Sequence, residues 1–274
     1  MTSRRADGLL PFFLITFAVA WVFFGAGAAV SVGAQALRIA VLLPGIFAPA
    51  IVALLLTARS EGREGVKNLL GKILQGPVAA RWYVFAATYT IGIKMAAALL
   101  HRVIAGEWPP FGQEAWYVLV AGTIISTPVQ AGEEVGWRGY ALPRLAARLG
   151  LARGSILLGA VWACWHLPFF FMTGTDTVGQ SFPLYLAQVT AVSVAMAFLW
   201  WKAGGSLLPV MLFHAAVNNT KDAVPSAEPG ASNAFALSHS LVAWLTVALL
   251  WACAGWFLGK MRGVRGVEPP PAPA

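Results

Sequence analysis

Three short motifs hold the side chains whose types and spacing could perform chemistry in this sequence. They read "EEVGWR" at 133–138, "WACWH" at 162–166 and "HAAVN" at 214–218. Their candidate functional residues are Glu133, Glu134, Arg138, His166, His214 and Asn218. A carboxylate in an apolar pocket is a better base toward a bound water than one in bulk solvent. Histidine and asparagine can donate hydrogen bonds to the oxyanion that forms when such a water attacks an amide, so these motifs suit peptide-bond hydrolysis.

Helical spacing determines which of these groups can meet. Side chains four residues apart lie on one face of a helix. Glu134 can therefore pair with Arg138. Glu133 points about 100° away from this pair and can contact other groups. His214 and Asn218 share a face in the same way. We expect the Glu134–Arg138 pair to be structural and Glu133 to be chemically active.

Metal binding is a second chemistry open to the same residues. Glu133, His166 and His214 could hold zinc and leave a fourth position for water. The HExxH signature of common metalloproteases is missing from the sequence. The two cysteines, Cys164 and Cys253, lie in apolar runs without metal-ligand spacing, and we interpret them as packing residues.

The composition is that of an integral membrane protein. Hydrophobic residues make up 58% of the 274 residues and charged residues only 11%, against about 25% charged in soluble domains. The mean hydropathy is +0.70. The net charge of +8 is better interpreted as basic loops on the cytoplasmic side than as a nucleic-acid surface, so we expect no nucleic-acid partner.

The elements that must position these motifs are membrane-spanning helices, each about 20 apolar residues long. Eight candidate spans lie at 9–30, 38–57, 82–104, 114–135, 154–173, 183–202, 206–220 and 238–259. With the N-terminus inside, fifteen Lys and Arg residues fall on inner segments and three on outer segments. This bias predicts an all-α bundle of about eight spans with both termini in the cytoplasm.

The depth of the motifs in these spans supports a common site. At about 1.5 Å per residue from the cytoplasmic starts of their segments, His166 lies about 18 Å deep and His214 about 12 Å deep. If the fourth segment runs on to Leu142, where Pro143 would stop it, Glu133 lies about 13 Å from that end. Three helices are thus expected to bring these groups to a similar level in the inner leaflet.

Taken in order, the three motifs resemble those of the CAAX-protease and bacteriocin-processing family, CPBP, also called the abortive-infection family. The pattern of these intramembrane endopeptidases is EExxxR, then FxxxH, then HxxxN or HxxxD, on successive membrane helices. The resemblance covers residues 115–220 of this chain. Trp162 stands where the family usually has Phe, which keeps an aromatic wall but enlarges it.

The resemblance implies a role for each motif residue. Glu133 is the general base that activates water, and His166 positions that water or assists proton transfer. His214 and Asn218 stabilise the oxyanion. Glu134 pairs with Arg138 and, with Trp162, supports the site. We favour a metal-free glutamate mechanism without a cofactor, and zinc held by Glu133, His166 and His214 is the alternative.

These observations predict a single membrane-embedded domain over 1–274, with a catalytic core at 115–220 and a disordered tail at 264–274. We expect an intramembrane endopeptidase that cuts a hydrophobic or lipidated peptide near the cytoplasmic leaflet of a bacterial plasma membrane. A proton-coupled transporter is one alternative, although the inverted repeats typical of transporters are not detectable in the sequence. A non-catalytic immunity or scaffold protein is another.

Overall fold

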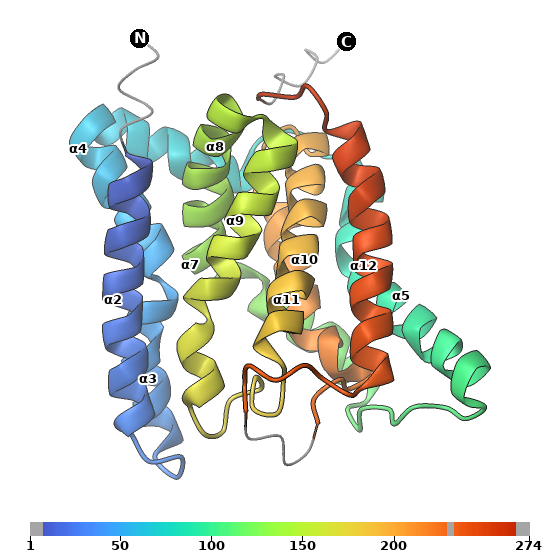
Figure 1. The fold of residues 1–274 in the computed structure, drawn as a ribbon. Coiled ribbons are helices and arrows are strands. Elements are labelled where there is room, and N and C mark those ends of the chain that lie inside the picture. Colours follow the sequence, from blue (N-terminus) through green and yellow to red (C-terminus); the bar gives the residue numbers. More distant parts are fainter. Residues whose placement is uncertain (1–7, 229–232, 267–274) are drawn as a thin grey trace.

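The computed structural model describes residues 8–228 and 233–266, and these residues form helices and connecting loops without a β-strand (Figure 1). The α-helices are α2 Leu9–Ala29, α3 Gln35–Ile46, α4 Ala48–Gly71, α5 Ala80–Ala105, α6 Trp116–Ser126, α7 Ala131–Glu134, α8 Leu142–Leu149, α9 Leu151–Trp165, α10 Phe182–Lys202, α11 Leu208–Thr220 and α12 Leu241–Lys260. The predicted all-α class is confirmed. Residues 267–274 of the predicted disordered tail lie outside the described residues.

Six segments of the described chain are long and apolar enough to cross a membrane. They are Leu9–Ala29, Gln35–Leu74, Ala80–Ala105, Leu151–Phe171, Phe182–Lys202 and Leu241–Lys260. The predicted ranges 114–135 and 206–220 form shorter helices instead. In the first, α6 gives way after 11 residues to a 3-10 turn at Thr127–Gln130 that contains Pro128, and in the second, α11 has 13 residues.

Helix α10 lies at the centre of the bundle. It packs against α9 and α12, and α11 packs against α5. In its most apolar window 72% of the residues are buried, which is the largest share among the six candidate spans. Helix α2 begins and α12 ends at the same end of the bundle (Figure 1). The short helices α7 and α11 lie among these longer ones, and Glu133, Glu134 and His214 on them are buried.

The chain between α7 and α8 winds as a π-helix over Val135–Ala141, and all seven of its residues are buried. π-Helical turns are rare and occur frequently at functional sites. This turn packs against α4 at very short range, because a Cβ on Gly136 would lie 2.4 Å from the carbonyl oxygen of Pro49. Glycine at 136 therefore lets the chain that carries Glu133 approach α4 backbone to backbone.

We expect Gly136→Ala to lower the free energy of unfolding by about 1–3 kcal/mol, because an added methyl group must push the π-helix away from Pro49. The matched control is Gly92→Ala in α5, where no atom lies within 4 Å of the new Cβ. The control should be neutral or more stable by up to about 1 kcal/mol. Chemical unfolding of both variants in detergent measures the difference, and equal stability would contradict the close packing.

Candidate active site

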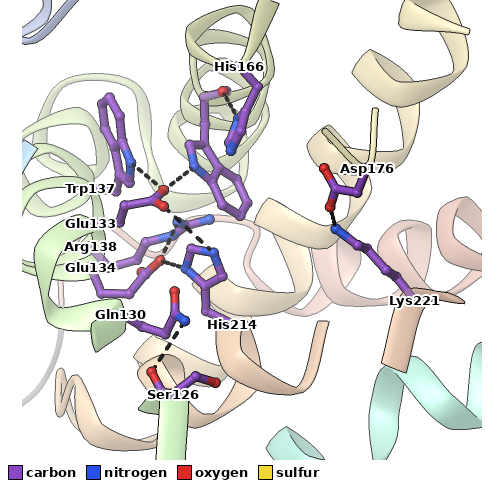
Figure 2. A network of polar contacts seen from close by, with 11 residues as sticks. Ser126, Gln130, Glu133, Glu134, Trp137, Arg138, His166, Asp176, His214 and Lys221 are labelled. Carbon is purple, nitrogen blue, oxygen red and sulfur yellow. Dashed lines mark hydrogen bonds and ion pairs between the residues drawn. The ribbon is translucent and has the colours of Figure 1, made fainter. Parts of the chain in front are cut away.

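A fully buried cluster of charged groups joins α7, the π-helix and α11 (Figure 2). Nη1 of Arg138 donates a hydrogen bond to Oε1 of Glu134 at 3.0 Å, and neither side chain is accessible to solvent. Nδ1 of His214 lies 2.8 Å from the same carboxylate oxygen. The pair predicted from the four-residue spacing is confirmed, and His214 joins it from a helix 80 residues away in sequence.

Glu133 makes a separate set of contacts on another face of its helix. Its Oε2 accepts hydrogen bonds from the indole nitrogens of Trp162 at 2.8 Å and Trp137 at 3.3 Å. Its Oε1 lies 4.0 Å from Nε2 of His214, which is too far for a hydrogen bond. This separation suits two atoms that each form a hydrogen bond of about 2.8 Å to the same water molecule. The carboxylate is therefore held by one oxygen and presents the other toward His214.

The two histidines share a tautomer that their partners determine. A carboxylate and a backbone carbonyl can only accept, so Nδ1 of His214 donates to Glu134 and Nδ1 of His166 donates to the Trp162 carbonyl at 2.8 Å. In each neutral ring Nε2 is then left as a proton acceptor. The Trp162 ring joins the histidines, with centroid distances of 5.6 Å to His166 and 5.1 Å to His214.

The remaining predicted residue, Asn218, lies one helical turn after His214 and is exposed. It lines a cavity of about 220 Å³ together with Trp162, His166 and His214. The structure thus brings all the predicted side chains to one region, although His166 contacts the glutamates only through Trp162. The sequence interpretation missed Trp137 as a donor to Glu133, and its position four residues after that glutamate is the signal that could have identified it.

The Trp162 ring makes a cation–π contact with Arg138. The guanidinium carbon of Arg138 lies 4.4 Å from the centroid of the ring. Trp162 therefore contacts the structural ion pair with its ring face and Glu133 with its N–H. No group of three His, Cys, Asp or Glu side chains in the described chain is arranged to hold a metal ion. The zinc alternative consequently lacks a preassembled set of ligands, and both histidines would have only Nε2 to offer.

Buried carboxylates and imidazoles that meet inside a helical membrane bundle, beside a cavity, are the features of a functional site. Comparison with known proteins identifies the family. Residues 112–220 match the model of the Rce1-like family, described as type II CAAX prenyl endopeptidase Rce1-like. A relative, CAAX prenyl protease 2 of Methanococcus maripaludis, is 25% identical over 226 residues, which cover 76% of this chain and 81% of that protein.

The chain therefore belongs to the Rce1-like CAAX prenyl endopeptidases, and it is a protease of this family with several candidate membrane spans. This confirms the family that the three motifs indicated. All the predicted site residues fall inside the matched range.

We expect Trp162→Phe to lower kcat/KM about tenfold. The variant keeps the aromatic wall but removes the shorter of the two hydrogen bonds to Glu133, and a hydrogen bond to a charged group contributes about 1.5–3 kcal/mol. Trp137 remains as the longer donor. The measurement is peptide cleavage under subsaturating substrate.

The matched control is Trp165→Phe, because Trp165 is equally buried and its indole nitrogen has no hydrogen-bond partner in the described part of the chain. This variant should cleave within about twofold of the wild type. An equal loss in both variants would mean that ring size matters and the N–H contact with Glu133 does not.

Proposed function

We propose that the protein hydrolyses a peptide bond inside the membrane, with Glu133 as the general base. The single observation that supports this most strongly is the arrangement of the Glu133 carboxylate, which is fixed by two indole donors through Oε2 while Oε1 faces His214. Such a carboxylate is 7% exposed and cannot exchange freely with bulk water. In this proposal Oε1 of Glu133 binds one water molecule and is not surrounded by bulk solvent.

In the proposed reaction Glu133 removes a proton from water as the water oxygen attacks the scissile carbonyl carbon. The carbonyl oxygen becomes an oxyanion, and the proton is passed to the amide nitrogen as the C–N bond breaks. The products are a carboxylate and an amine. His166, whose Nδ1 donates to the Trp162 carbonyl so that Nε2 is the proton acceptor, positions the water or carries the proton to the leaving nitrogen.

His214 and Asn218 stabilise the oxyanion in this proposal. Because Nδ1 of His214 already donates to Glu134, its Nε2 can donate to the oxyanion only when the ring is an imidazolium. Asn218 adds an amide donor from the next turn of α11 and needs no proton transfer. Glu134 and Arg138 therefore hold His214 in place without touching the substrate.

The substrate class that we propose is a hydrophobic or lipidated peptide, which enters from a lipid bilayer, and a prenylated peptide is the form that we favour. The family description names prenyl endopeptidases, and the relative from Methanococcus maripaludis is named a CAAX prenyl protease. We also propose that both termini are cytoplasmic and that α6–α7 and α11 complete an eight-segment bundle in a bacterial plasma membrane. The bias of basic residues toward one end supports this orientation.

The decisive experiment is a cleavage assay with the purified protein in lipid nanodiscs. A farnesylated peptide and the same peptide with S-methyl cysteine are incubated in water enriched in oxygen-18, and products are identified by mass spectrometry. We expect one new carboxyl group that carries the label, formed faster from the farnesylated peptide. Repetition with 1,10-phenanthroline tests the zinc alternative. Absence of any cleaved product from either peptide would overturn the proposal.

A further inference from the structure

Helix α10 forms a wall of the cavity beside the buried cluster, although it carries none of the three sequence motifs. It packs against α9, which ends just before His166, and against α11, which carries His214 (Figure 1). Four side chains of α10 line the cavity: Tyr185, Gln188, Val189 and Val192. They are spaced three or four residues apart or adjacent to such a position, so they share one face of the helix. A polar group on this face can therefore reach a peptide held in the cavity.

Tyr185 is the only tyrosine among the described residues that line this cavity. Its ring lies edge-on to the ring of His166, with the two centroids 5.8 Å apart. Its hydroxyl is close enough to the Glu133 carboxylate for the two groups to interact electrostatically. The same hydroxyl forms no hydrogen bond with any described residue. Tyr185 therefore lies beside the proposed catalytic groups with an O–H donor that no described residue accepts.

The oxyanion of a tetrahedral intermediate needs hydrogen-bond donors that are already in place. Nε2 of His166 is an acceptor in the neutral ring, and Nε2 of His214 can donate only when that ring is protonated. Asn218 contributes a single amide group. A tyrosine hydroxyl is protonated at neutral pH and can turn about its C–O bond toward a new acceptor. Tyr185 thus offers a donor that requires no earlier proton transfer.

We infer that Tyr185 is a further catalytic residue, whose hydroxyl donates a hydrogen bond to the oxyanion formed when water attacks the scissile carbonyl. This inference rests on the proposed peptidase function. The phenol keeps its proton throughout, so the transfer of the water proton by Glu133 to the leaving nitrogen is unchanged. The hydrogen bond is stronger to the charged oxyanion than to the neutral carbonyl of the bound peptide. Loss of the hydroxyl therefore lowers kcat and leaves KM nearly unchanged.

The kinetic test uses Tyr185→Phe, which removes the hydroxyl and keeps the ring beside His166. Removal of one oxyanion donor lowers kcat by about 10²–10³-fold, so we expect farnesylated-peptide cleavage in nanodiscs to lose about 10²-fold in kcat with KM within about threefold. The matched control is Tyr89→Phe in α5. The Tyr89 ring packs against Phe213 at 5.3 Å, and Tyr89 is not among the described residues that line the cavity. The control should keep kcat within about twofold of the wild type.

A binding measurement separates donation to the oxyanion from a general effect on peptide binding. A farnesylated phosphinate peptide places a tetrahedral, negatively charged group at the scissile position, and it should bind Tyr185→Phe at least tenfold more weakly than the wild type. The same peptide with a methylene group in place of the scissile carbonyl should bind both proteins equally.

The outcomes distinguish this inference from the peptidase proposal. Cleavage by Tyr185→Phe within threefold of the wild-type kcat, or an equal effect of the substitution on both analogues, would overturn the role of Tyr185 and leave the peptidase proposal intact. Absence of cleavage by the wild-type protein would refute the peptidase proposal and the role of Tyr185 together.

Discussion

Glu133→Gln is expected to reduce kcat for peptide cleavage by about 10³-fold, because general-base catalysis contributes about 10²–10⁴-fold and an amide cannot accept the proton of water. The fold should survive this change. Glutamine has the same shape, and its amide oxygen can still accept the indole hydrogen bonds from Trp162 and Trp137. The variant also removes a carboxylate that is only 7% exposed, so stability should be unchanged or slightly higher.

Single-turnover cleavage and thermal unfolding of the same preparations measure the two quantities separately. Substrate binding should persist, which a fluorescent, uncleaved peptide analogue can report. Asp at position 133 provides a graded comparison, since Glu133→Asp keeps the carboxylate but withdraws it by about one methylene group and should retain a small fraction of the activity. Cleavage by Glu133→Gln within tenfold of the wild-type rate would eliminate this residue as the base.

The sequence predicted those parts of the site that depend on spacing within one helix or on motif order. The Glu134–Arg138 pair follows from positions four apart, and the structure confirms it at 3.0 Å. The separate contacts of Glu133 follow from the 100° rotation between neighbours in a helix. The convergence of α7 with α11 was expected from the depth of the motifs, and His214 does reach Glu134. Six of the eight ranges predicted from hydrophobic length correspond to helical segments that are long and apolar enough to cross a membrane.

Other features depend on tertiary packing and could not be read from one sequence. The π-helix over Val135–Ala141 replaces the regular continuation of the fourth segment. It depends on the close approach of Gly136 to Pro49, a contact between residues 87 positions apart in the numbering (136 − 49). The division of 114–135 into α6, a 3-10 turn and α7 also shortens a run that hydropathy alone predicts as continuous. Neither turn leaves a periodic signal in the apolar residues.

The second large effect is expected from Glu134, the neighbour of the proposed base. Glu134→Gln should lower the free energy of unfolding by about 3–5 kcal/mol, because removing one partner of a buried pair leaves the other charge uncompensated. Arg138 is fully buried, and its Nε and Nη2 have no hydrogen-bond partner among the described residues, so Glu134 provides its direct ion pair. His214 loses its charged partner in the same variant.

The matched control for this change is Glu61→Gln. Glu61 also pairs with an arginine at 3.1 Å, but its side chain is 36% exposed, so the substitution should cost no more than about 1 kcal/mol. Adding Arg138→Met to Glu134→Gln removes both buried charges and should recover much of the loss, which makes the two substitutions strongly non-additive. Chemical unfolding in detergent yields the stabilities of Glu61→Gln, Glu134→Gln, Arg138→Met and the double variant, each relative to the wild type. Equal losses for Glu134→Gln and Glu61→Gln would mean that the buried pair carries no special energetic role.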